Sequence, residues 1–205
     1  MPKRPSYLAR QFSIRLTILE NTRAKVEILL TRGELDRNDI EAVYSGLFLD
    51  AFTEFEALTE TLFLGLFDGS LKSAAQPANR LFRITPKSHA RSIAFEGKAY
   101  VDWLPMEDKT IPRAKRFFDG ANPFSCLSSQ EKLDLKYAHL LRNALAHKSD
   151  AATKGFLATI GQQPLLPHEK SPAGYLRTLP QGPTGPTQFS IKLNSLKSIA
   201  QKLCL

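Results

Sequence analysis

The chain has 205 residues, of which 42% are hydrophobic, and this is enough for one globular domain with a sizeable core. Its formal net charge of +8 at pH 7 favours a polyanionic partner, either nucleic acid or an acidic protein, although a merely soluble basic protein accounts for the charge equally well. The only two cysteines, Cys126 and Cys204, exclude a disulfide framework and a cysteine-rich metal site, and the N-terminal sequence lacks the apolar core of a signal peptide, so we expect reduced cysteines in a cytoplasmic protein.

Helical periodicity dominates the N-terminal third of the chain. Apolar residues recur at three- and four-residue steps and predict a first helix over about residues 6–31 and a second from about residue 36 to Phe67, with a bend or break at Gly46. The stretch Leu47–Phe67 is apolar on almost every side, yet it contains four carboxylates, each of which would cost about 2.5 kcal/mol or more inside a membrane. We therefore expect the buried central helix of a helical bundle rather than a membrane span.

The middle of the chain combines short elements with basic residues. Short helices are predicted over Ser88–Glu96 and Lys109–Phe118, and a brief alternation over Arg80–Thr85 favours an extended segment. Aromatic residues lie near two basic clusters, which suits RNA through phosphate contacts and base stacking, although Trp103 itself is expected to pack in the core. The candidate RNA-binding residues are Arg80, Arg83, Arg113, Lys115 and Arg116, together with Lys148 further along the chain.

The strongest helix signal is the stretch of residues 130–150. Its apolar residues recur at three- and four-residue steps, and neither Gly nor Pro interrupts it. Ser128, followed three residues later by Glu131, is a capping-box pattern, so the helix is expected to begin near Ser128 or Ser129. The sequence therefore predicts one amphipathic helix with a polar stripe in its C-terminal half.

The polar stripe holds the candidate catalytic residues Arg142, Asn143 and His147, and His139 stacks on the same side at four-residue spacing. Arg142 and His147 are separated by about 7.5 Å along the helix axis, so a long guanidinium arm can converge with the imidazole on one small group. Arg presents a charged fork that matches phosphate oxygens, and His exchanges protons near neutral pH. The pair suits RNA cleavage by 2′-hydroxyl attack without a metal, but a polar helix edge without chemistry shows the same spacing.

Carboxylates of the second predicted helix are candidates to support this pair. An acid that faces the motif would hold Arg142 or set the tautomer of His147. We expect Glu54 or Glu56 in this role, and ordinary surface positions for both are the alternative.

The C-terminal quarter contains a Gly- and Pro-rich segment between two helical stretches. A helix is expected to end at about Ile160, and residues 161–187 are predicted to form an irregular loop. Alternation over Gln188–Ile191 favours a short β segment, and Leu193–Leu203 is predicted to be an amphipathic closing helix. Because the chain has no zinc-ligand spacing and no Gly-rich phosphate loop, we expect neither a metal nor a cofactor.

Residues 142–150, RNALAHKSD, resemble the signature of HEPN-domain proteins, in which an Arg is followed after four to six residues by a His. The segments YVDWLP (residues 100–105), NPFSCL (122–127) and PAGYLR (172–177) are similar to the RiboL-PSP/MAE-type branch of that family, so the resemblance extends over roughly residues 47–205. Membership would imply an all-helical fold and a metal-independent ribonuclease that acts as a toxin or antiviral effector. It would also imply an active site where the motif helices of two protomers meet.

These observations together predict a single all-α domain over residues 1–205, a HEPN-like helical bundle that includes the 161–187 loop. The predicted function is a metal-independent endoribonuclease of a toxin or phage-defence system, with RNA, a second copy of the chain and a cognate antitoxin or defence protein as partners. A catalytically inactive RNA- or protein-binding module of the same fold is the main alternative. A purely structural helical protein is the least specific one.

Overall fold

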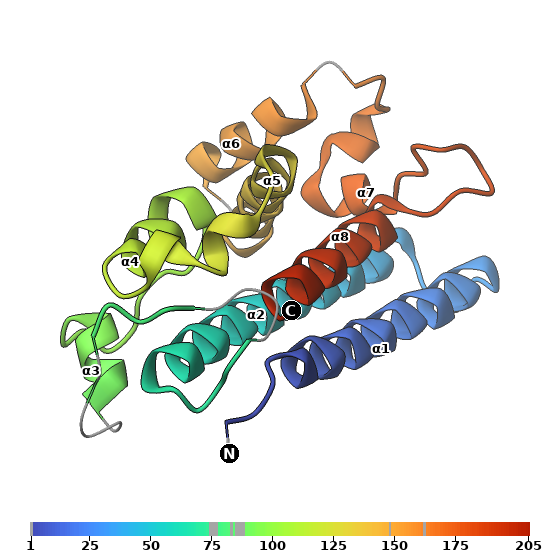
Figure 1. Cartoon of the computed structure of the whole chain (residues 1–205). Helices are drawn as coiled ribbons and strands as arrows, with labels where there is room; N and C mark the ends of the chain where they lie inside the picture. Colours follow the sequence, from blue (N-terminus) through green and yellow to red (C-terminus); the bar gives the residue numbers. More distant parts are fainter. Residues whose placement is uncertain (1, 74–77, 83, 85–88, 148, 162) are drawn as a thin grey trace. The chain divides into compact units, whose positions relative to one another are not determined.

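The computed structural model describes residues 2–73, 78–82, 84, 89–147, 149–161 and 163–205 (Figure 1). Over these residues the fold is all-α, which confirms the predicted class, and the only β pairing consists of the isolated bridges Lys3–Leu71 and Arg80–Phe118. The helices are α1 (Ser6–Thr31), α2 (Arg37–Asp68), α3 (Ala90–Phe95), α4 (Ile111–Lys115), α5 (Ser129–Ala146), α6 (Asp150–Ile160), α7 (Pro172–Arg177) and α8 (Gln188–Leu203).

The chain divides into two compact units, and each consists of separate stretches of sequence. Unit 1 comprises residues 1–12, 54–136 and 197–205, and unit 2 comprises residues 13–53 and 137–196. Helices α1, α2, α5 and α8 each contribute residues to both units. The single domain expected from the sequence stays a prediction.

Helix α2 follows the sequence expectation for most of its length. It runs from Arg37 to Asp68 as one element that includes Gly46, so the chain does not leave the helix at this glycine. Within the expected central stretch, Phe48, Phe55 and Phe63 are fully buried. Among the residues that the structure describes, no helix combines the length and apolar character needed to cross a membrane.

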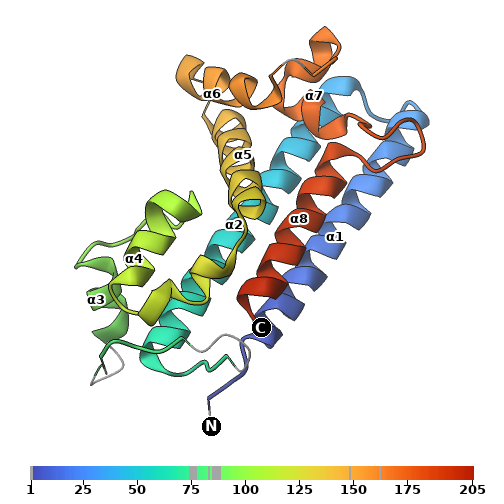
Figure 2. The same ribbon diagram turned by 45° about the horizontal axis from the view of Figure 1, so that its top comes forward.

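The core of unit 1 is a cluster of aromatic rings around Phe63 of α2. This fully buried ring lies 5.0–6.3 Å, centroid to centroid, from five others, and burying each such side chain contributes about 1.5–3 kcal/mol. Trp103 is one of them, and its burial confirms that it packs in the core. Helices α3 and α4 lie beside the C-terminal turns of α2 in this unit (Figure 2). The other four rings belong to Phe67, Phe117, Phe118 and Phe124.

The helix expected over Lys109–Phe118 begins earlier and ends sooner. A π-helical turn over Met106–Thr110 leads directly into α4, which stops at Lys115. The buried Thr110 hydroxyl donates to the Trp103 carbonyl, which ties this turn to the aromatic cluster. The boundaries therefore follow packing around Trp103 rather than local helical periodicity.

In unit 2, the β segment expected over Gln188–Ile191 is wrong, because α8 begins at Gln188. The Thr187 hydroxyl accepts a hydrogen bond from the Ser190 backbone N–H at 3.2 Å, which caps the start of the helix. Phe189 and Leu193 then follow at helical spacing, and both are buried.

The segment expected to be an irregular loop also contains regular structure. Within residues 161–187 lie the 3₁₀ turn Pro167–Lys170 and the short helix α7. Ser171 caps α7, since its side chain accepts a hydrogen bond from the Gly174 N–H at 2.9 Å, and Pro172 occupies the first helical position. The abundance of prolines here therefore marks helix starts as well as turns.

A polar network lies inside unit 2, and we call it the Glu27 network. The Tyr44 hydroxyl donates to Glu27 Oε1 at 2.7 Å, and Arg177 donates to both Glu27 oxygens at 3.2 and 3.3 Å. Arg23 Nη1 reaches the Tyr44 oxygen at 3.4 Å. Burial raises the pKa of the fully buried Tyr44 hydroxyl well above its usual value, and the hydrogen bond to Glu27 acts in the same direction. Helices α1, α2 and α7 are thereby joined through part-buried hydrogen bonds.

Candidate functional site

Helix α5 begins as the sequence predicts. The Ser128 side chain accepts from the Glu131 N–H at 3.2 Å, and Glu131 accepts from the Ser128 N–H at 2.6 Å, which completes the capping box. Lys202 of α8 donates to Glu131 at 2.7 Å within unit 1. Burial alone would raise the pKa of Glu131, but the hydrogen bonds from Lys202 and Ser128 outweigh it and lower that pKa.

In the unit 2 part of α5, the structure joins three residues of the polar stripe by hydrogen bonds. Arg142 Nη1 donates to Asn143 Oδ1 at 3.1 Å, and Asn143 Nδ2 lies 3.0 Å from His139 Nε2. Because the amide nitrogen can only donate, this contact requires Nε2 of His139 to be the acceptor, which places the proton of the neutral ring on Nδ1. Asn143 thereby connects the guanidinium to an imidazole one helical turn earlier.

His139 contributes more to the site than the sequence suggested. Its ring is half-buried and lies 6.0 Å from the ring of Phe52, within unit 2. The four-residue spacing between His139 and Asn143 was the signal in the sequence for this contact.

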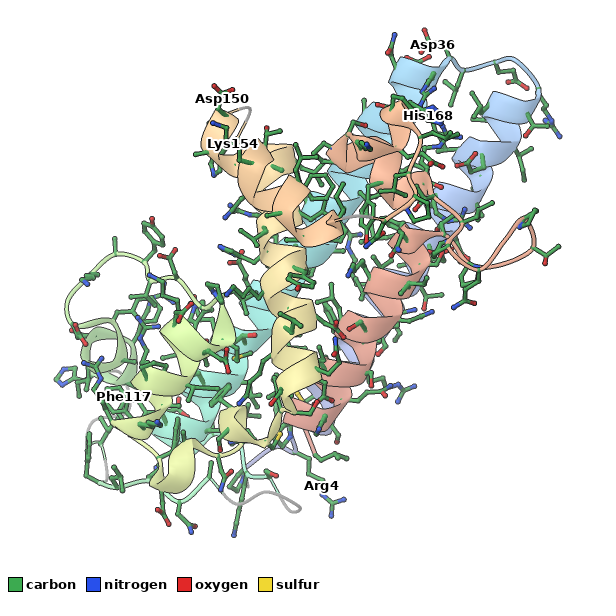
Figure 3. All side chains as sticks on the ribbon, turned by 90° about the horizontal axis from the view of Figure 1, so that it is seen from above. Arg4, Asp36, Phe117, Asp150, Lys154 and His168 are labelled. Carbon is green, nitrogen blue, oxygen red and sulfur yellow. The ribbon has the colours of Figure 1, made fainter. Side chains whose placement is uncertain are left out.

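His147 is the first residue beyond α5, and it is exposed. Its backbone N–H still donates to the Asn143 carbonyl at 2.8 Å, so the helical hydrogen-bond pattern continues through this residue. Its own carbonyl accepts from the Ser149 N–H at 2.8 Å, and Ser149 then caps α6, which begins at Asp150 (labelled in Figure 3). The imidazole therefore sits at the α5–α6 junction, open to solvent. That Arg142 and His147 converge on one group stays a prediction.

The two candidate supporting acids lie on α2. Glu54 and Glu56 are half-buried, both take part in polar interactions, and both belong to unit 1, whereas the motif belongs to unit 2. Their role beside Arg142 or His147 stays a prediction. Within unit 2, the neighbouring Asp50 forms an ion pair with Arg15 at 2.6 Å.

Three of the candidate RNA-binding arginines lie in unit 1 and already contact protein groups. Arg80 donates to the Phe67 carbonyl at 3.4 Å, and Arg113 donates to the Asp102 carbonyl at 3.1 Å. Arg116 forms an ion pair with Glu96, whose carboxyl pKa is lowered chiefly by that hydrogen bond. Lys115 is exposed on α4, and the remaining two candidates, Arg83 and Lys148, lie outside the described residues.

Unit 1 also carries surface hollows. One of them, about 740 Å³, is lined by Tyr7 and by Arg91 and Glu60, which form an ion pair with each other. A smaller one, about 290 Å³, is formed by residues of the loop before the π-helical turn and by α4. In the described part of the chain, no three His, Cys, Asp or Glu residues are grouped so that they could hold a metal ion.

Comparison of the chain with protein-family models, with curated proteins and with solved structures finds no match. The resemblance to HEPN proteins therefore depends on the residues quoted above, and the family assignment stays a prediction. The sequence pointed to the Arg142–Asn143–His147 motif. It gave no sign of the Glu27 network, whose members Glu27 and Arg177 are 150 residues apart.

Proposed function

We propose that this chain is a HEPN-like endoribonuclease that cleaves RNA without a metal, through Arg142, Asn143 and His147. The observation that supports the proposal is the arrangement at the end of α5. Asn143 holds the Arg142 guanidinium, and the same residue's carbonyl receives the backbone N–H of an exposed His147. A permanently charged fork on the last turn of α5 and a proton-exchanging group on the residue that directly follows the helix are thus close in the chain.

The reaction assigned to these groups is transesterification at phosphorus. The 2′-oxygen attacks the adjacent phosphate, a 2′,3′-cyclic phosphate forms, and the bond to the 5′-oxygen breaks. Neutral His147 takes the 2′-hydroxyl proton, or protonated His147 gives a proton to the departing 5′-oxygen. Arg142 stabilises the negative charge that develops on the phosphate oxygens. Asn143 positions Arg142 and can also donate to a phosphate or ribose oxygen.

The proposed enzyme is a homodimer. One copy of the motif supplies one exposed imidazole, whereas the reaction needs one group to remove a proton and another to deliver one. Twofold pairing of two identical motifs supplies both, because an isologous interface places the same residues on each side of the symmetry axis. An antitoxin or defence-system protein that covers this surface is the proposed protein partner, and the proposed location is the cytoplasm.

The test is cleavage of single-stranded RNA by the purified full chain in the presence of EDTA. We expect products with 2′,3′-cyclic phosphate and 5′-hydroxyl ends. His147→Ala is expected to lower the cleavage rate at least about 100-fold, as loss of general acid–base catalysis does, and Arg142→Ala by about 100- to 1,000-fold. Arg142→Lys should not restore the rate, because a lysine lacks the planar fork.

His168→Ala is the matched control. His168 is also an exposed histidine of unit 2, on the 3₁₀ turn before α7 (Figure 3), and its loss should leave cleavage unchanged. Cleavage that persists in both motif variants would remove Arg142 and His147 from the mechanism. RNA binding without cleavage by the wild-type chain would favour the inactive binding module.

A further inference from the structure

The most exposed large side chain with apolar character in the described residues is Tyr100, at 74% exposure. It precedes the buried Trp103 in the loop that connects α3 to the π-helical turn. An aromatic ring held this far into water contributes little to the core, because its apolar surface stays hydrated. Its position therefore calls for a role other than packing.

The ring of Tyr100 forms part of the smaller hollow of unit 1. The hollow has a volume of about 290 Å³ and an open mouth, and Val101 adds an apolar surface beside the tyrosine. This is at the lower end of the range for pockets that bind small molecules, about 300–1,000 Å³. It suits one flat ring with a charged group at its edge. The remaining lining residues are Lys98, Asp102, Lys109 and Arg113.

Positive charge predominates around this ring, since three cationic side chains face one carboxylate. Lys98 is exposed, and Lys109 is paired with Asp102 at 3.7 Å across a solvent-exposed gap. An exposed ion pair of this kind contributes little to stability, so an incoming phosphate can compete for the lysine at small cost. The cations are therefore available to an anionic ligand.

Arg113 is held more firmly than the two lysines. Its Nη1 donates to the Asp102 carbonyl at 3.1 Å, and its guanidinium lies 5.0 Å from the centre of the Trp103 ring. Burial, together with the neighbouring positive charge of Arg116, lowers the pKa of Arg113 from its ordinary value. Even so, an arginine remains charged at every physiological pH, so the hollow contains one cation held by protein contacts and two lysines at its exposed edge.

We propose that this hollow, which we call the Tyr100 hollow, binds one unpaired nucleotide of single-stranded RNA. The base stacks on the Tyr100 ring, and the flanking phosphates contact Lys98, Lys109 and Arg113. An aromatic platform within a cationic rim is the arrangement by which proteins bind single strands without reading their sequence. The choice of RNA as the strand rests on the proposed ribonuclease function, whereas the stacking chemistry rests on the hollow alone.

The test measures stacking separately from charge. The full-length His147→Ala protein, used so that the RNA is not cut, is titrated into a fluorescently labelled eight-nucleotide oligouridylate and into a base-free ribose-phosphate strand of equal length. Tyr100→Ala is expected to weaken binding of the oligouridylate about tenfold, in the range that stacking of one base supports, and to leave binding of the base-free strand within about twofold. Tyr100→Phe should bind both strands as the parent does.

Three further measurements sharpen the result. Tyr7→Ala replaces another exposed tyrosine of unit 1 and is the matched control, with no expected change in affinity. Lys98→Gln should reduce the slope of log K against log salt concentration by about 0.7, the loss of one phosphate contact to a single strand. A 5-iodouridine in the probe should crosslink to Tyr100 under ultraviolet light, as assigned by mass spectrometry of the peptides.

Each possible result of these measurements supports or overturns one of the two proposals. Equal oligouridylate affinity in the Tyr100→Ala protein and its parent overturns the proposal. An equal loss of affinity for the two strands also overturns it, because it indicates a purely electrostatic surface such as one that binds an acidic peptide. If the wild type cleaves RNA but Tyr100→Ala does not weaken oligouridylate binding, the ribonuclease proposal is supported and the Tyr100 hollow is not. If Tyr100→Ala weakens binding but the wild type does not cleave RNA, the Tyr100 hollow is supported and the ribonuclease proposal is not.

Discussion

The two compact units are stabilised by different chemistry, although four helices supply residues to both. Unit 1 is built around stacked and edge-on aromatic rings, and its arginines lie at the rim, as Arg113 does beside Trp103 and Arg116 beside Phe117 at 5.6 Å. Unit 2 instead contains part-buried, hydrogen-bonded charges, in the Glu27 network. The comparison shows that one small chain can combine a core of packed aromatic rings with a part-buried network of charged and polar side chains.

The largest expected effect tests the aromatic half of this comparison. Phe63→Ala removes the central ring of unit 1 and is expected to lower the free energy of unfolding by about 3–5 kcal/mol, through lost burial and the cavity left behind. Urea unfolding of the full chain measures it. Phe82→Ala is the control, since this ring is 45% exposed at the edge of the same cluster and should cost about 1 kcal/mol or less. Similar losses in both variants would contradict a core centred on Phe63.

A smaller effect is expected from the Glu27 network. Glu27→Gln removes the negative charge that faces Arg177 and replaces one of the two carboxylate acceptors with an amide NH₂ group, and it should lower the free energy of unfolding by about 2 kcal/mol. Glu34→Gln replaces an exposed acid that lies 3.8 Å from Arg32, and it should change the same quantity by less than about 0.5 kcal/mol. If the two substitutions cost the same, the network does not stabilise unit 2.

The smallest expected effect concerns alkaline pH. The folded-state pKa of Tyr44 lies above the unfolded value of about 10, so its contribution is fully present below pH 10 and is lost as the pH rises through the folded value. Tyr44→Phe should therefore reduce the loss of unfolding free energy between pH 9 and pH 11 by about 1 kcal/mol.

This difference is read from urea unfolding at the two pH values. Burial raises the pKa of the Cys204 thiol of unit 1 to about 12, so the wild type and Tyr44→Phe share that second alkaline contribution. The comparison of the two proteins therefore isolates the tyrosine. Tyr100→Phe removes an exposed hydroxyl, so its free energy of unfolding should fall between pH 9 and pH 11 as much as that of the wild type. A smaller fall in Tyr100→Phe, equal to that in Tyr44→Phe, would argue against a specific contribution of the buried Tyr44 hydroxyl.

Local signals in the sequence predicted the features that depend on neighbouring residues. The capping box of Ser128 and Glu131, the length of α2 and the stacking of His139 on Asn143 all follow from spacings of three or four residues. The β segment at Gln188 was wrong because a few alternating residues fit a strand and a helix start equally well, and Thr187 provides the cap that decides between them.

Features that depend on distant residues could not be predicted. No pattern in the sequence connects Glu27 with Arg177, and none shows that the Thr110 hydroxyl donates to the Trp103 carbonyl. The Tyr100 hollow is of the same kind, because its cations come from the loop, the π-helical turn and α4. The candidate motif Arg142–Asn143–His147 is local, and for that reason its residues could be chosen from the sequence while their partners across the fold could not.

The chain's single tryptophan allows the unfolding of unit 1 to be followed separately by fluorescence. Trp103 is buried in unit 1, with its indole N–H donating to Glu60 at 3.1 Å and the Arg113 guanidinium over its ring. Its emission should therefore report the melting of this unit alone, whereas far-ultraviolet circular dichroism follows helices in both. Denaturation curves from the two signals would coincide if the units unfold as one cooperative body and would separate if unit 2 loses its helices independently.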